Sequence, residues 1–499
     1  MSSTPVVKAE SISLLAAVEP SLGTQPTSGW QTLQPNAGGL GAFYLKTKTV
    51  ARSPLTKLRQ LEGSKIVDAD AQPTLAHDFD KDLIDLFAEA MFLAKAKHTG
   101  GTGLAYFTPT ARTTTDYTVA ASGALQQNTL VFARGFVNAA NNGLFAVGSG
   151  STATAIKVAS GTAETVSGYV TTLEVAGWRG ASGDIGIDVN GNLTSTTADF
   201  TTMGLTVGQV IWVGGTTAGT TFATTAYRGF AKITAISAHL LTLSRRMWTV
   251  GAADPGTGKT IDLYWGRFLR NVAFGATDYT ETSFQFELTY TGLSGGTVDE
   301  YVYAAGNLVD QTKFTFPTAN LVTVDMTFLG TTIGKPTTTR ATGASTAAAT
   351  LASEGLTTAT EQLYEQIMIQ ATEAVVSSDI ETSALTLMNH ISAQKQHGFL
   401  GTKRPIVGKA EATLDATVEL TQDDAIKACQ DNTTLMYGAG LRNGDGGWFF
   451  DIPSCKCTDA PPTFPANGPV TLALKLAAFR DPTNNYTLGM SLFPFLPAS

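Results

Sequence analysis

The stretch Lys409-Ala-Glu-Ala-Thr-Leu-Asp-Ala-Thr-Val-Glu-Leu420 decides the fold class of this chain. Small or apolar residues occupy every second position, and charged residues or threonines lie between them. A period of two predicts a β-strand with one buried and one solvated face. The same alternation, now with aromatic residues, recurs over 283–290 and 320–329. These segments predict a mainly β protein.

Two series of predicted elements lie on either side of a linker rich in Thr and Ala at 341–354. Each series has a strand, a long loop, an Ile-Val step, a second strand and a helix. In the first they are a strand from Phe43, the loop 51–64, Ile66-Val67, the strand 65–75 and a helix beginning at Asp82. In the second they are the strand 385–391, the loop 392–404, Ile406-Val407, the strand 409–420 and a helix beginning at Asp423. The Ile-Val steps are 340 residues apart (406 − 66) and the helix starts 341 (423 − 82), which predicts a duplication.

The 499 residues are more than one domain normally needs. Residues 111–254 differ in character from their surroundings, because they are rich in Thr, Ala and Gly with short strand candidates. We therefore predict two tandem β-sandwich or split-barrel domains, each flanked by an α-helix, with small β-domains inserted in the first. The predicted boundaries are an N-terminal arm at 1–40, a first domain at 41–110 and 255–340, an insert of two small β-domains at 111–254, and a second domain at 355–499.

Composition and charge exclude some functions. The net charge is −8 and only 15% of residues are charged, so a basic nucleic-acid-binding surface is disfavoured. The first 20 residues lack the apolar core of a signal peptide, and no apolar run approaches the length of a membrane helix. The 3 cysteines are too few for a disulfide framework, which favours the reducing cytoplasm.

No motif predicts catalysis, a cofactor or a metal, so we expect a protein that is not an enzyme. The run Ala253-Asp-Pro-Gly-Thr-Gly-Lys-Thr260 matches a relaxed P-loop, but an aromatic, strand-like segment follows it instead of a helix. The acidic run from Asp78 to Glu89 has calcium-loop spacing without the required glycine. Cys455 and Cys457 are too close together for common zinc sites. A nucleotide hydrolase remains a remote alternative.

The two predicted long loops combine basic and apolar residues, which is unusual for solvated loops and indicates a partner surface. The alternative is a loop folded back on its own domain. The candidate contact residues are Arg52, Leu55, Lys57, Leu58 and Arg59 in one loop, and Lys395, Phe399, Lys403 and Arg404 in the other. Acidic residues gather on the solvated strand faces, which are ordinary for a sheet or would line a pore: Asp68, Asp70, Glu411, Asp415 and Glu419.

The segment from Gly29-Trp-Gln-Thr-Leu-Gln-Pro-Asn36 to Val67-Asp-Ala-Asp70 resembles the major tail tube proteins of long-tailed (siphovirus-type) bacteriophages. The resemblance covers residues 25 to 97 by sequence, and 260–340 and the second series by order of elements only. It implies β-sandwich domains that assemble into stacked rings around a DNA-conducting lumen. It also implies that a long hairpin loop of each domain reaches the neighbouring ring, and that the lumen is acidic.

The resemblance and the duplication together imply a structural virion protein. Three copies of a two-domain chain would form a ring with pseudo-sixfold symmetry, and such rings would stack helically. Expected partners are the chain itself and the other tail proteins (tape measure, tail terminator and tail tip), with DNA passing without specific binding and no membrane. The protein would be assembled in the host cytoplasm and reside in the virion tail. A cell-surface adhesin or receptor-binding β protein is the main alternative.

Overall fold

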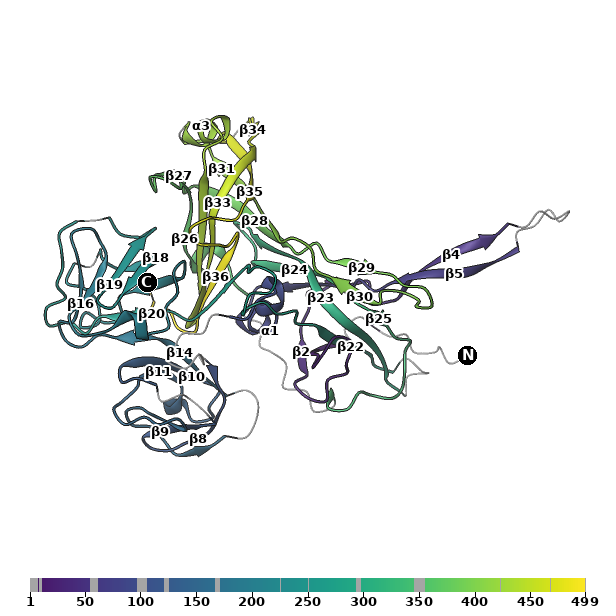
Figure 1. Ribbon diagram of the computed structural model, residues 1–499, viewed down its shortest axis with the longest axis horizontal. Coiled ribbons are helices and arrows are strands. Elements are labelled where there is room, and N and C mark those ends of the chain that lie inside the picture. The colour runs from purple at the N-terminus through teal and green to yellow at the C-terminus, as the bar shows by residue number, and fades with distance from the viewer. Residues whose placement is uncertain are drawn as a thin grey trace. The chain divides into compact units, whose positions relative to one another are not determined.

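The computed structural model describes residues 8, 11–53, 62–96, 106–120, 125–166, 171–224, 226–249, 251–292, 298–344, 355–421, 423–466 and 468–498. The protein is mainly β, with several sheets and few helices, which confirms the predicted class. Figure 1 shows the chain as a ribbon. Its contacts divide it into two compact units. Unit 1 comprises Met1–Ala94, Tyr279–Thr357 and Thr382–Ala416. Unit 2 comprises Lys95–Asp278, Thr358–Glu381 and Thr417–Ser499.

The sheet of unit 1 is antiparallel and joins strands from both ends of the first series. Strand β1 pairs with β2 and β22, β22 with β23, β23 with β24 and β25, β24 with β6, and β6 with β3. Strands β4 and β5 form a separate hairpin. The bounds are β1 Ile12–Val18, β2 Gln31–Leu33, β3 Leu40–Gly41, β4 Lys46–Arg52, β5 Glu62–Asp70, β6 Thr74–Asp78, β22 Phe284–Tyr290, β23 Glu300–Phe316, β24 Thr323–Leu329 and β25 Thr332–Ile333.

Helix α1 (Lys81–Phe92) packs on the apolar side of this sheet. Its Phe87 ring lies 4.6 Å from that of Phe284 and 5.8 Å from that of Phe328, between centroids. The predicted spacing of apolar residues is the cause, because it places Leu83, Phe87 and Met91 on one buried stripe. The run from Asp78 that matched a calcium loop is therefore the start of this helix.

Asp80 is the N-cap residue of α1, and substituting it tests whether its side chain stabilises the start of the helix. Its carboxylate accepts a hydrogen bond of 2.8 Å from the Leu83 amide, and burial raises its pKa to about 6. We expect Asp80→Ala to lower the free energy of unfolding by about 1 kcal/mol, and Asp80→Asn to stay within about 0.5 kcal/mol. Because the raised pKa disfavours the ionised native state, the Asn variant should gain on the wild type as the pH rises through 6. Urea unfolding at several pH values measures both effects, and equal stability of the Ala and Asn variants would contradict the cap.

Four strands of the second series lie largely in unit 1. Strand β28 (Ile380–Met388) pairs with the second half of β23. Strand β31 (Glu411–Glu419) lies later in the chain and pairs with β28. Between them, β29 (Ser392–Gln394) and β30 (Arg404–Ile406) form a second hairpin. In β31, Ala412, Leu414, Ala416 and Val418 are buried and the residues between them are not, which confirms the predicted alternation.

Unit 2 repeats the pairing order of unit 1. Strand β26 pairs with β27 and β32, β32 with β33, and β33 with β35 and β36. Near its end β31 pairs with β35, where the Leu420 amide donates to the Val470 carbonyl at 2.9 Å. The bounds are α2 Thr358–Glu361, β26 Gln362–Ile369, β27 Val375–Ser377, α3 Asp424–Gln430, β32 Leu435–Asn443, β33 Gly446–Asp459, β34 Pro462–Thr463, β35 Thr471–Ala478 and β36 Gly489–Phe493.

Two irregularities in the strand pairing also recur at equivalent places in the two series. A register shift is a β-bulge or similar defect, which pairing by chance would not place at equivalent sites. The shifts lie at Phe284/Phe286 and Val309/Gln311 in the first series, and at Leu435/Tyr437 and Cys457/Asp459 in the second. The hydrogen bond from Leu420 to Val470 also has a counterpart, from the Phe79 amide to the Val322 carbonyl at 2.8 Å.

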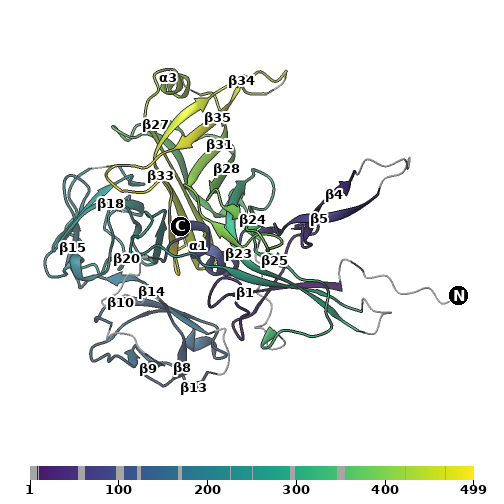
Figure 2. The ribbon, with the colours of Figure 1, turned by 45° about the vertical axis from the view of Figure 1, so that its right-hand side comes forward.

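The segment predicted as an insert belongs to unit 2 and has two apolar cores. One gathers around Tyr117, Val131 and Leu173, and the other around Phe200, Ile233 and Trp265. Figure 2 shows the corresponding lobes, with β8 and β9 in one and β18 in the other. The bounds are β7 Tyr106–Phe107, β8 Pro109–Arg112, β9 Asp116–Val119, β10 Thr129–Arg134, β11 Gly143–Ala146, β12 Ala155–Lys157, β13 Glu164–Thr165, β14 Thr172–Arg179, β15 Ile185–Ile187, β16 Leu193–Ser195, β17 Val210–Val213, β18 Gly229–Ser237, β19 Leu240–Ser244, β20 Asp262–Tyr264 and β21 Arg267–Arg270, with short 3-10 helices at Ala139–Asn141 and Phe200–Thr202.

The insert packs on the second series, although the chain enters and leaves it within the first. Phe230 of the insert lies 5.0 Å from Phe449 of β33 and 5.6 Å from Phe493 of β36, between ring centroids. A buried ion cluster lies in the same unit: the Asp451 carboxylate accepts from Arg245 Nη1, from Lys232 Nζ at 2.7 Å and from Tyr486 Oη at 2.5 Å. The insert is therefore an integral part of the unit 2 core.

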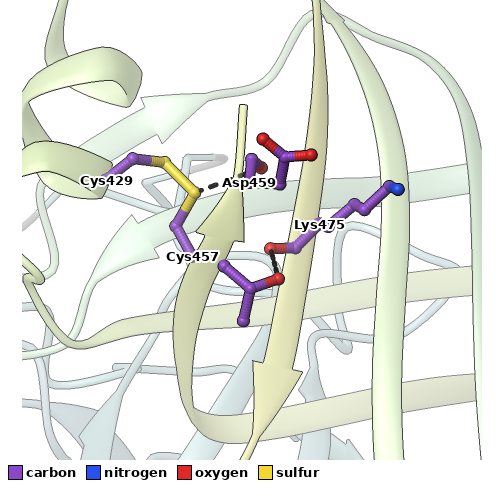
Figure 3. The surroundings of a disulfide bond; sticks show 5 residues. Cys429, Cys457, Asp459 and Lys475 are labelled. Atoms are coloured by element: carbon purple, nitrogen blue, oxygen red, sulfur yellow. Dashed lines mark hydrogen bonds between the residues drawn. A yellow bond between two sulfur atoms is a disulfide. The ribbon is translucent and has the colours of Figure 1, made fainter. Parts of the chain in front are cut away.

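Two further features differ from what the sequence suggested. The predicted N-terminal arm contributes strand β1 and the buried Trp30 to unit 1. Cys429 at the end of α3 forms a disulfide with Cys457 in β33, as Figure 3 shows, so two of the cysteines are not free thiols. Their Cα atoms are 5.0 Å apart although 28 residues separate them in sequence. The third, Cys455, is buried and free.

Candidate functional site

The hairpin β4–β5 is the most exposed regular element of unit 1. Every residue of β4 is exposed, and β4 pairs with β5 through a ladder that runs from Lys46 and Asp70 to Arg52 and Glu62. Figure 1 shows the hairpin extending away from the rest of unit 1. Val50, Ile66 and Val67 expose half of their surface or more. The strands are otherwise largely polar, so these three apolar side chains, exposed together on a projecting hairpin, mark the candidate partner surface.

The predicted contact residues of this hairpin are only partly described. Arg52 ends β4 and is exposed. Leu55, Lys57, Leu58 and Arg59 lie outside the described residues, so their predicted role stays a prediction.

The second predicted loop forms the hairpin β29–β30 and lies against the base of the first. Lys395 Nζ donates to Asp68 Oδ1 at 2.8 Å, to Asp70 Oδ1 at 2.5 Å and to the Ala69 carbonyl at 2.9 Å. The hydrogen bond from Lys395 holds the pKa of Asp68 below its usual value. The structure thus joins one predicted loop residue with two predicted lumen residues. Lys395 fixes β29–β30 to β5 and partly neutralises both carboxylates.

The other predicted contact residues of the second loop face solvent. Phe399 and its neighbour Leu400 each expose more than half of their surface. Lys403 bonds to the Gln396 side chain, and Arg404 begins β30 in an exposed position. The predicted combination of exposed cations and exposed apolar groups is therefore present at the tip of β29–β30.

The remaining predicted lumen residues lie on the polar face of β31. Glu411 and Asp415 are exposed and Glu419 is half-buried. His390 Nε2 lies 2.9 Å from Glu411 Oε2, whereas Asp415 has no side-chain partner among the described residues. In unit 1 the polar face continues through Asp325 of β24, an exposed acid that the sequence analysis did not single out. The alternation of Asp325 with the apolar Val324 and Met326 is the sequence pattern that could have identified it as a residue of the polar face.

The residues considered for other chemistry have structural roles. Ala253–Thr260 is a turn that joins β20 without a helix, and Lys259 Nζ donates to the Ala218 carbonyl at 2.7 Å. In the described part of the chain, no group of three or more His, Cys, Asp or Glu side chains could hold a metal ion. Within the same residues, no helix is long and apolar enough to cross a membrane.

No protein-family model matches the chain, and no curated protein matches its sequence.

Proposed function

We propose that this chain is a structural virion protein that polymerises as stacked rings into the tail tube of a long-tailed phage. Each ring would contain three chains and, because each chain has two similar domains, have pseudo-sixfold symmetry. The tube would be assembled in the host cytoplasm and would meet the tape measure, tail terminator and tail tip proteins.

The recurrence of strand pairing supports this proposal more than any other observation. Two series share the order of strands, the hairpin, the helix and the positions of two register shifts. We interpret them as tandem tube domains that arose by duplication, with α1 and α3 as flanking helices. Such a pair of domains suits a ring in which the order of the pseudo-symmetry is twice the number of chains.

The two hairpins supply one projecting surface for each domain. Both are separate two-stranded sheets, and both present exposed apolar residues, with Val50 and Ile66 in one and Phe399 in the other. Contact between stacked rings would bury these groups, a favourable contribution of about 25 cal/mol per Å² of apolar surface.

The polar face of β31 supports a role in conducting DNA. Asp415 and Glu411 project from an exposed face in a chain of net charge −8. A wall of like charge repels phosphates, so the DNA slides without binding. In this proposal the insert lies on the exterior of the tube.

Electron microscopy of the purified protein at high concentration tests the proposal. We expect hollow tubes whose end-on class averages show three chains and six similar inner lobes. Six chains in a ring would retain the tube and refute the duplication argument. Discrete particles without a lumen, even after seeding with tail-tip complexes, would refute the tube and favour the adhesin.

A further inference from the structure

The pairing of β23 with β28 joins the first series to the second within unit 1. The antiparallel register runs from Gln311 opposite Met388 to Phe316 opposite Ser383. On its other side the same half of β23 pairs with β24. We call this pairing the internal joint. It covers an edge of β23 that would otherwise be open.

The second series has the same edge without a strand to cover it. Gln311 lies opposite Thr327 and Thr315 opposite Thr323, just as Asp459 lies opposite Lys475 and Thr463 opposite Thr471. The counterpart of 311–316 is therefore 459–464, which we call the joint edge. Among the described residues it pairs only with β35.

One phenylalanine in each segment shows the effect of a neighbouring strand, because its exposed fraction differs between the internal joint and the joint edge. Phe316, beside the internal joint, exposes 3% of its surface. Its counterpart Phe464 exposes 74%. A phenylalanine buries about 150–250 Å² when it is covered, so leaving it in water is a substantial cost that a partner strand would remove.

The strand that could cover the joint edge is present in the first series. Strand β28 pairs with β31, and its counterpart β3 pairs with β6. Strand β28 has 9 residues, whereas β3 stops at Gly41 after 2. The chain beyond it is irregular up to Lys46, with Ala42 at φ 54° and Tyr44 exposed. We call Leu40–Lys46 the free strand. It lacks the neighbour that keeps β28 regular.

We propose that the free strand of one chain pairs with the joint edge of a second copy and repeats the internal joint between molecules. The proposal rests on the proposed function, because this contact is head-to-tail and closes only in a ring. Each chain then has one internal and one external joint of the same geometry. The register of the internal joint, carried over, brings Lys46 close to Asp459, a pair of opposite charges.

Pro462 on the joint edge is compatible with this pairing. It occupies the position of Phe314, since Pro462 lies opposite Leu472 as Phe314 lies opposite Val324. Proline has no amide hydrogen, so the external joint has fewer hydrogen bonds than the internal one. Prolines are found on edge strands, where they restrict pairing with wrong partners before assembly.

Substitution of Phe464 tests the external joint. We expect Phe464→Asp to melt like the wild type, since the side chain is exposed, and to raise the critical concentration for polymerisation at least about ten-fold. Val137→Asp is the matched control, because Val137 is still more exposed but lies in the insert, and it should polymerise normally. Sedimentation measures the critical concentration. Normal polymerisation of Phe464→Asp would overturn the joint.

Crosslinking tests the geometry independently. With Thr463→Cys and Ala42→Cys in one chain, a short bismaleimide should link assembled rings into covalent trimers. Thr463→Cys with Val137→Cys should give none. If the first variant forms rings like those of the wild type but gives no crosslinks, the joint is refuted and the tube is retained. Wild-type protein that forms no ring under any condition would refute the proposed function, and the joint with it.

Discussion

Asp451→Asn is expected to lower the free energy of unfolding of unit 2 by about 3–5 kcal/mol. Asp451 is buried and accepts from Lys232, Arg245 and Tyr486. Removing its charge leaves two buried cations, Lys232 and Arg245, without their nearest anion. Loss of one partner from a buried ion cluster costs far more than the cluster itself contributes, because the remaining charges stay desolvated.

Urea unfolding of unit 2 measures this effect, and a surface pair provides the control. Asp116→Asn breaks the contact of 3.4 Å with Lys157 in the same unit, on a partly solvated surface. We expect that variant to lose at most about 1 kcal/mol. Equal losses in the two variants would show that the Asp451 cluster does not hold the insert on the second series.

The deficit of Asp451→Asn should also depend on pH. Burial lowers the pKa of Lys232 well below its usual value. The folded state therefore binds this proton less tightly than the unfolded state, and stability rises with pH until the ordinary lysine pKa near 10.4. Because the variant lacks the nearest anion, the pKa of its Lys232 should be lowered further, so its deficit should shrink as the pH rises toward the depressed pKa of Lys232 in the wild type. A constant deficit would contradict this account.

Truncation of the hairpin β4–β5 is expected to abolish tube formation without unfolding the chain. Arg52 and Glu62 are paired, so Asn-Gly can replace residues 53–61 as a two-residue turn. The strands that remain are exposed and contribute little to the core, so the melting temperature should not change. Electron microscopy should then show rings or single chains in place of tubes, because contacts between rings are lost.

Point substitutions separate the hairpin surface from exposed apolar residues in general. Val50→Ser and Ile66→Ser should raise the critical concentration for tubes. Val137→Ser and Val189→Ser, at still more exposed positions of the insert, should not. Tubes of normal length from the truncated hairpin would show that ring stacking uses another surface.

Local sequence patterns predicted the individual strands and helices whose formation depends on the periodicity of nearby residues. The alternation over 409–420 predicted β31, and the spacing of Leu83, Phe87 and Met91 predicted α1. The exposed cations and apolar residues of 392–404 were also found, because a loop that avoids its own core retains its composition at the surface.

Long-range pairing could not be predicted in the same way. Nothing near Lys232 indicates that it is buried against Asp451, more than 200 residues away, or that Cys429 meets Cys457. The attachment of Lys395 to Asp68 and Asp70 likewise depends on two hairpins being neighbours. The equivalence of Phe316 and Phe464 likewise follows from the strand registers, and only the pairing of β23 with β28 gives it a physical meaning.

Neither unit is a continuous stretch of chain, and this has a consequence for biosynthesis. Unit 1 needs residues up to Ala416, long after the ribosome has made most of the insert, and unit 2 needs the C-terminal strands. The joint edge at 459–464 therefore emerges after every residue of unit 1. A nascent chain lacks the surface that would accept a neighbour until all of unit 1 has been made, so self-association at the ribosome is delayed until that unit can fold.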